Sequence, residues 1–381
     1  MRRLTLFLLV LLAHPALAQP AGGAAGGAVP LDSLDALVEA FAAEADLPSV
    51  VVAVVRDGRR QVATAGAVGG AAPTARTPYE VGSVTKVVTA LVLAEMAQRG
   101  EVALATPVGD LLPDSVRVPA GGAAPVTLAD LATHTSGLPR LPPTLLLTAD
   151  PGDPYAAYGT GDLYAFLDLY ELPRAPGAAY EYSNLGGGLL GLALTRRAGG
   201  ADLEAESGGA AYGALARERV LGPLGMDETV VAVPEARGLA PAVGPSGEPV
   251  PHWTWTDATV GAGGLRSTAA DLLTLAEATI APPPDLPAPL AAALVEAARP
   301  LRPVQGAMRI GLGWHVLPVG RPGDGVVWHD GGVGGGSSFV GLDREAGVGV
   351  VVLANKGGAG QTVTAFGFGL LRRLLGAAGD E

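Results

Sequence analysis

The sequence predicts an α+β fold in which one antiparallel sheet is assembled from both ends of the chain and flanked by terminal helices. Three observations support this fold class. A helical segment and two strand-like segments open the chain, strand-like segments and a helix close it, and the long region between them is mostly helical in pattern. We expect one domain over residues 31–381, with a sheet part at about 31–80 and 300–381 and a helical insertion at about 81–299.

The opening elements differ in their periodicity. Residues 31–45 place apolar side chains at helical spacing, and the pattern stops before Pro48. Residues 49–55 are a β-branched run, and Asp57-Gly58 is a turn signal that leads into a second strand over 61–67. These segments predict a helix followed by an antiparallel hairpin.

The same two periodicities predict the later elements. Helices are expected at 84–99, 127–134, 163–169, 185–197, 212–221, 268–280 and 362–375, and strands at 311–317, 326–329, 337–342 and 347–353. Clustered prolines between residues 139 and 154 predict an irregular segment.

The N-terminus has the three parts of a secretory signal: a charged start, an apolar run over 4–13, and small residues that place cleavage after Ala18. We expect residues 1–18 to be a signal peptide and residues 19–30 a flexible leader. An uncleaved anchor is the alternative, although the apolar run is short for a bilayer span. The chain has no cysteine to carry a lipid or a disulfide. These features predict a periplasmic or secreted protein without stable membrane insertion.

Charge and histidine content argue against several classes of partner. The formal net charge is −12, and no basic stripe is present, which argues against nucleic acid. Four histidines remain after residue 18, and none is paired at the spacing of helical metal ligands. No P-loop or dinucleotide fingerprint occurs. We therefore predict no metal and no cofactor, and the sequence carries no signal of an oligomeric state.

Ser83 and Lys86 form the first candidate pair for chemistry. Ser83 lies at the start of the helix expected from Val84, where free backbone N–H groups favour an anion. Lys86 follows one turn later, so its amine lies near the serine hydroxyl and could accept its proton in a dry pocket. The alternative is a capping serine with a solvated lysine. Lys86 is one of only two lysines in the chain, which favours a specific role.

Tyr182 and Asn184 form a second candidate pair, in a loop before a helix. A nearby lysine could lower the pKa of the Tyr182 phenol and make it a base or proton shuttle. Asn184 could orient Lys86 or hold a substrate carbonyl. The alternative is that Asn184 only caps the helix and that Tyr182 belongs to the core.

His329, Gly331 and Gly332 lie in a third segment, between two strand-like runs. Glycines at a strand edge allow a ligand to approach the backbone closely, and His329 offers a hydrogen-bonding group there. The alternative is a glycine-rich hairpin loop with an exposed histidine. The G-x-S-x-G motif of α/β-hydrolases is absent.

Taken in order, Ser83-Val84-Thr85-Lys86, Tyr182-Ser183-Asn184 and His329-Asp330-Gly331 resemble the three motifs of the serine β-lactamase and penicillin-binding-protein superfamily. Tyr-x-Asn resembles the branch of class C β-lactamases, D-alanyl-D-alanine carboxypeptidases and esterases. Residues 131–139, 221–226 and 261–268 also resemble that branch, and the resemblance covers about 32–375.

The resemblance implies a role for each matched residue. Ser83 is the acylated nucleophile, Lys86 its proton acceptor or electrostatic partner, and Tyr182 a base that also protonates the leaving group. Asn184 orients Lys86 and substrate, and the N–H groups of Ser83 and Gly332 form the oxyanion hole. His134 and Ser136 are expected to be structural.

The third motif departs from the Lys-Thr-Gly of β-lactamases. A largely neutral His329 beside Asp330 is expected to grip a substrate carboxylate less well, and Asp330 would repel one if it faced the pocket. We therefore expect an exported hydrolase acting on a small-molecule or peptidyl substrate, with ester or amide hydrolysis favoured over β-lactam hydrolysis. A catalytically silent sensor or binding domain is the alternative, and a polysaccharide-binding module lacks the necessary aromatic stripes.

Overall fold

The computed structural model describes residues 33–122, 124–199, 207–318 and 325–376. Its centre is an eight-stranded antiparallel sheet in the order β2-β1-β12-β11-β10-β9-β8-β7. The strands are β1 (Ser49–Arg56), β2 (Arg59–Gly66), β7 (Arg302–Gln305), β8 (Met308–Ile310), β9 (His315–Leu317), β10 (Val326–Val333), β11 (Gly336–Asp343) and β12 (Val348–Ala354). Because β1 from one end of the chain pairs with β12 from the other, the predicted joining of the two ends is confirmed.

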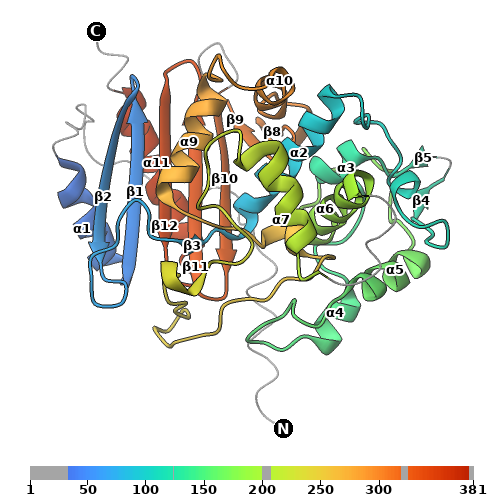
Figure 1. Ribbon diagram of the computed structural model, residues 1–381, viewed down its shortest axis with the longest axis horizontal. Coiled ribbons are helices and arrows are strands. Elements are labelled where there is room, and N and C mark those ends of the chain that lie inside the picture. Colours follow the sequence, from blue (N-terminus) through green and yellow to red (C-terminus); the bar gives the residue numbers. More distant parts are fainter. Residues whose placement is uncertain (1–32, 123, 200–206, 319–324, 377–381) are drawn as a thin grey trace.

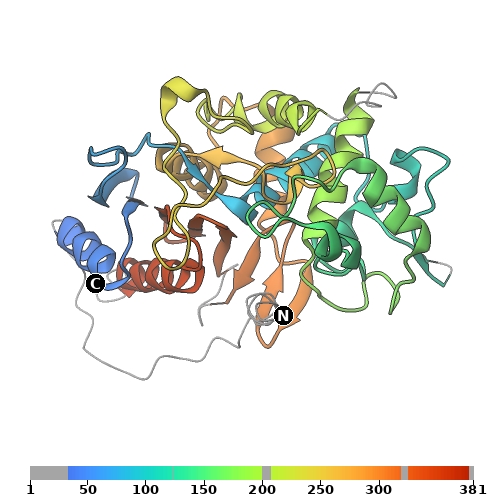
Figure 2. The ribbon, with the colours of Figure 1, turned by 90° about the horizontal axis from the view of Figure 1, so that it is seen from below.

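Helices cover both faces of this sheet (Figures 1 and 2). The terminal helices α1 (Leu34–Glu44) and α11 (Gly360–Gly376) cover one face, as the sequence predicts. On the other face, α9 (Ala269–Ile280) packs against β1, β11 and β12. The long insertion therefore returns one helix to the sheet before the last strands begin.

The helical insertion lies beside the β10 side of the sheet, around the buried helix α2 (Thr85–Gln98) (Figure 1). Its other helices are α3 (Leu128–Ala132), α4 (Pro143–Thr148), α5 (Thr160–Leu169), α6 (Asn184–Gly199), α7 (Ala210–Ala216), α8 (Val260–Gly263) and α10 (Ala288–Ala297). Two-stranded pairings join β3 (Tyr79–Glu80) to β6 (Arg266–Ser267) and β4 (Ala120–Gly121) to β5 (Ala124–Pro125). The α+β fold with a largely helical insertion is confirmed.

Strand β1 shows why the sheet needs helices on both faces. Every residue from Ser49 to Val55 is buried. Val50, Val52 and Val54 join the core beneath α1 and α11, whereas the alternating residues Val51, Ala53 and Val55 join the core shared with the insertion. A strand buried on both sides has the continuous apolar pattern that this segment shows.

The expected signal peptide (1–18) and leader (19–30) lie outside the described residues. Within the described ranges, no helix is long and apolar enough to cross a bilayer.

Candidate active site

Ser83 lies in a short 3-10 turn, Gly82–Val84, that runs directly into α2, so its predicted position at a helix start is confirmed. Gly82 has φ +50°, and a Cβ there would lie 2.8 Å from the backbone nitrogen of Gly332. Glycine both tolerates this φ and leaves room for the contact. The turn therefore presses the backbone of Ser83 against strand β10.

Lys86 is buried, with 4% of its surface exposed. Its Nζ lies 3.1 Å from Ser83 Oγ and donates hydrogen bonds to Asn184 Oδ1 (2.8 Å) and the carbonyl of Ala262 (2.6 Å). Burial lowers the pKa of Lys86 well below its ordinary value, and the positive charge of Arg140 lowers it further. A solvated lysine is thus excluded, and the amine can accept a proton from Ser83.

Glycines of α6 explain how the carbonyl of Ala262 reaches Lys86. A Cβ on Gly188 would lie 2.2 Å from the carbonyl oxygen of Ala258, and one on Gly191 would lie 2.9 Å from Cα of Gly261. Larger residues at these positions would push α8 away from α6. The glycine-rich start of α6 therefore sets the close packing that completes the surroundings of Lys86.

Asn184 begins α6, but it is not the residue that caps the helix. The hydroxyl of Ser183 accepts the N–H of Gly186 at 2.8 Å, which leaves the Asn184 side chain to bond Lys86. Asn184 Nδ2 donates to the hydroxyl of Tyr155 at 3.2 Å. Tyr155 thereby keeps the amide oxygen of Asn184 turned toward Lys86. No sequence motif predicted this role of Tyr155.

The ring of Tyr182 lies between two basic side chains. Lys86 Nζ is 4.9 Å and Arg140 Cζ is 5.0 Å from the ring centroid. Burial nevertheless raises the pKa of the Tyr182 phenol above its ordinary value, and this outweighs the lowering by its hydrogen bond with Ser83 and by Arg140. The expectation of a lowered pKa was wrong, because desolvation of the phenolate exceeds the effect of the nearby charge. The phenol keeps its proton and is suited to donate it.

The third motif lies on β10 itself rather than in a hairpin loop. Strand β9 pairs with β10 only as far as Trp328, so the edge from His329 onward is not covered by β9. A Cβ on Gly331 would lie 2.0 Å from the carbonyl oxygen of Val81 and 3.0 Å from the nitrogen of Ser83. Gly332 is exposed, and a Cβ there would meet nothing within 4 Å. The strand therefore touches the Ser83 turn at Gly331 and opens to solvent at Gly332.

The side chains of His329 and Asp330 point to opposite sides of β10. Asp330 Oδ2 accepts a hydrogen bond from Thr364 Oγ1 of α11 at 3.3 Å, so Asp330 lies on the face away from the insertion. His329 is fully buried, with its ring 6.2 Å from that of Tyr182 and 5.3 Å from that of His315. The alternative of an exposed histidine is therefore wrong. Asp330 was expected to repel a substrate carboxylate only if it faced the pocket, and its side chain points to the other side of β10.

His134 and Ser136 hydrogen-bond backbone groups, as predicted. His134 Nδ1 accepts the N–H of Ser183 at 3.2 Å, and Ser136 Oγ accepts the N–H of Leu138 at 3.2 Å. Within the described part of the chain, no group of three or more His, Asp or Glu side chains is arranged to hold a metal ion.

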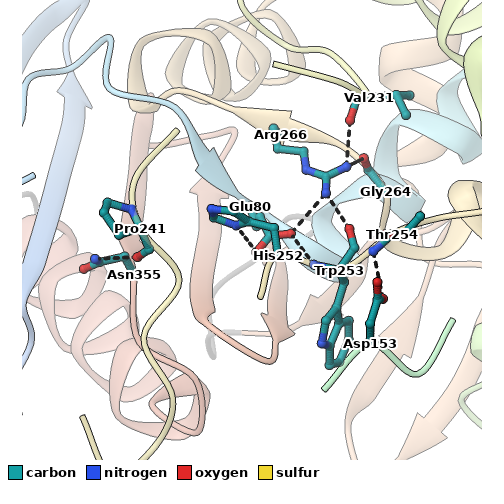
Figure 3. A network of polar contacts seen from close by, with 10 residues as sticks. All are labelled: Glu80, Asp153, Val231, Pro241, His252, Trp253, Thr254, Gly264, Arg266 and Asn355. Carbon is teal, nitrogen blue, oxygen red and sulfur yellow. Dashed lines mark hydrogen bonds and ion pairs between the residues drawn. The ribbon is translucent and has the colours of Figure 1, made fainter. Parts of the chain in front are cut away.

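A buried ion pair anchors the strand that leads to Ser83 (Figure 3). Glu80 on β3 bonds Arg266 on β6 at 3.2 Å and His252 at 3.0 Å, and it accepts the N–H of Trp253 at 3.3 Å. The Trp253 indole lies against Gly334, where an added Cβ would be 2.7 Å from Nε1. Glu80 therefore holds the 252–253 segment against the β10–β11 hairpin beside the candidate site.

Replacing Glu80 with Gln is expected to lower the free energy of unfolding by about 3 kcal/mol, because the buried charge of Arg266 loses its partner. The Glu80 and Arg266 side chains are 4% and 11% exposed. Glu277→Gln is the matched control, since it breaks the more exposed Arg60–Glu277 pair and should cost about 0–1 kcal/mol. Equal losses of stability in urea unfolding would contradict a structural role specific to Glu80.

The chain is similar to known proteins along most of its length. The family model described as Beta-lactamase matches residues 34–366. Esterase EstB of Burkholderia gladioli is 32% identical over 84% of this chain and 89% of its own length. The D-alanyl-D-alanine-carboxypeptidase/endopeptidase AmpH of Escherichia coli K12 is also 32% identical, but the match spans 51% of this chain and only 46% of AmpH. A solved class C β-lactamase superposes with a TM-score of 0.76 at 22% identity, covering 91% of this chain and 95% of that one.

Proposed function

The chain belongs to the β-lactamase family, and from that premise we propose that it is an exported serine hydrolase that forms an acyl-enzyme on Ser83. The observation that carries this proposal is the buried amine of Lys86, 3.1 Å from the Ser83 hydroxyl. A lysine with a lowered pKa beside a hydroxyl is the arrangement that activates a serine nucleophile.

The proposed reaction begins when neutral Lys86 takes the proton of Ser83 and the Ser83 oxygen attacks the substrate carbonyl. Backbone N–H groups of Ser83 and Gly332 stabilise the oxyanion. Tyr182, which keeps its proton, gives it to the leaving group as the bond to the carbonyl carbon breaks. The proton on Lys86 then passes to Tyr182, which restores both residues. Water attacks the acyl-enzyme and gives one proton to the Ser83 oxygen as the acid is released.

We assign the substrate to esters or amide/peptide bonds, with esterase or D-peptidase-like activity ahead of β-lactam hydrolysis. The third motif has His329 where β-lactamases have lysine, and His329 is buried. EstB and AmpH, whose names state esterase and carboxypeptidase/endopeptidase activity, support both substrate classes. Comparable turnover of a β-lactam and a short-chain p-nitrophenyl ester would count against this preference.

Labelling with a fluorophosphonate probe tests the nucleophile. We expect the wild type to be labelled and Ser83→Ala to be unlabelled, because only an activated serine reacts at a useful rate. Ser338→Ala is the control. In the wild type the Ser338 hydroxyl donates a hydrogen bond to the carbonyl of Val81 at 2.8 Å, so labelling should persist when this serine is removed. Labelling that survives Ser83→Ala overturns the assignment, and failure of the wild type to label would favour a catalytically silent sensor domain.

A further inference from the structure

His134 combines burial with an uncommon backbone conformation. Its φ is +55°, in the left-handed region that few residues other than glycine adopt. Within the described residues, the other non-glycine residues with a positive φ are Asp46 and Asp57, and both lie in exposed turns. His134 is only 2% exposed and follows α3 directly. Such a conformation inside a core costs free energy and is maintained only where surrounding contacts fix it, often at functional sites.

The contacts of His134 lie on both sides of Tyr182. Its carbonyl accepts the backbone N–H of Glu181 at 2.8 Å, and its Nδ1 accepts the backbone N–H of Ser183 at 3.2 Å. With φ at +55°, the carbonyl and the imidazole of one residue both reach the 181–183 segment. The backbone that carries Tyr182 is therefore bonded to His134 immediately before and immediately after the tyrosine.

The imidazole of His134 also lies against the side chain of Tyr182. The two ring centroids are 4.4 Å apart, and the ring planes are inclined by 35°. Because a backbone N–H can only donate, Nδ1 must be the accepting nitrogen and the neutral ring carries its proton on Nε2. Burial lowers the pKa of His134 well below its ordinary value, so the ring stays neutral and keeps the bond to Ser183.

We propose that His134 is a positioning residue that holds the phenol of Tyr182 where it can protonate the leaving group. Proton transfer requires the donor to lie within hydrogen-bond reach of the acceptor, and a displacement of about 1 Å can cost about 10²-fold in rate. This inference rests on the proposed function, because it takes Tyr182 as the donor. It goes beyond the expectation from the sequence that His134 is only structural.

Two substitutions at His134 separate its acceptor from its backbone conformation. Glycine and asparagine both tolerate a φ of +55°, but only asparagine keeps an acceptor near the position of Nδ1. We expect His134→Gly to lose about ten-fold more kcat/KM on an alkyl ester than on the p-nitrophenyl ester of the same acid, because p-nitrophenolate leaves without a proton. His134→Asn should recover part of the difference.

The ratio of the two kcat/KM values distinguishes positioning from general damage to the structure. A loss of folded enzyme lowers both rates alike and leaves the ratio unchanged. Ser136→Ala is the matched control, because buried Ser136 lies in the same segment and its hydroxyl accepts the N–H of Leu138 at 3.2 Å. Any loss in Ser136→Ala should be equal for the two esters.

The same substitution in the Tyr182→Phe background tests whether His134 acts through Tyr182. There, His134→Gly should no longer change the ratio, because the group that it positions is absent. A ratio that still changes would overturn the inference. If Tyr182→Phe shows unequal losses and His134→Gly shows equal ones, this inference fails while Tyr182 remains the donor. Equal losses in Tyr182→Phe would overturn the proposed role of Tyr182 and this inference with it.

Discussion

Replacing Lys86 with Met is expected to lower kcat/KM for an ester substrate by about 10³-fold, because Ser83 loses the base that takes its proton. Methionine has a similar length and fits a buried site, so the fold should persist. Fluorophosphonate labelling of Ser83 should slow by a similar factor. Steady-state kinetics and the labelling rate are the two measurements.

Lys356→Met provides the control, because it removes the only other lysine of the chain. Lys356 forms an ion pair with Asp46 at 2.9 Å and has no part in the proposed mechanism. We expect its kcat/KM to stay within about two-fold of the wild type. A Lys86→Met enzyme of near-normal rate would show that another group activates Ser83.

The Tyr182→Phe variant should lose about 10²-fold in kcat/KM on alkyl esters, whose leaving alkoxide needs a proton. The burial-raised pKa of Tyr182 keeps the phenol protonated, so its removal takes away the donor. The loss should be much smaller with p-nitrophenyl esters, because p-nitrophenolate leaves without a proton. Parallel kinetics on the two leaving groups measure the difference.

Tyr180→Phe is the matched control for this experiment. Its hydroxyl bonds His315 Nε2 at 2.9 Å rather than Ser83, so any effect should be equal for both leaving groups. Equal losses in Tyr182→Phe would argue that the phenol acts as a base in the attack rather than as a donor.

The sheet could be predicted because its central strands have a strong local signal. The continuous apolar run of β1 and the turn at Asp57-Gly58 fix the first hairpin without any knowledge of its neighbours. Strand β7 was missed because it is short and mostly exposed, and β8 was missed because it has only three residues. Helix α10 was not predicted; it follows Pro287 and has a proline in its first turn, where proline is well tolerated.

The candidate site could be predicted only in part, because motifs locate residues but not their environment. The motifs predicted that Ser83, Lys86, Asn184 and Gly332 would lie together, and the structure brings them together, because this placement depends on backbone position and spacing. They could not give the direction of the Tyr182 pKa, which depends on burial by distant segments.

The ionisation state of Lys86 tests the central claim most directly. With ¹⁵N-labelled lysine, the Lys356→Arg variant has Lys86 as its sole lysine, so a single Nζ resonance reports its titration. We expect Lys86 to lose its proton at a pH well below the ordinary lysine pKa of about 10.4. An ammonium signal that persists to about pH 10 would contradict the claim that Lys86 activates Ser83 as a neutral base.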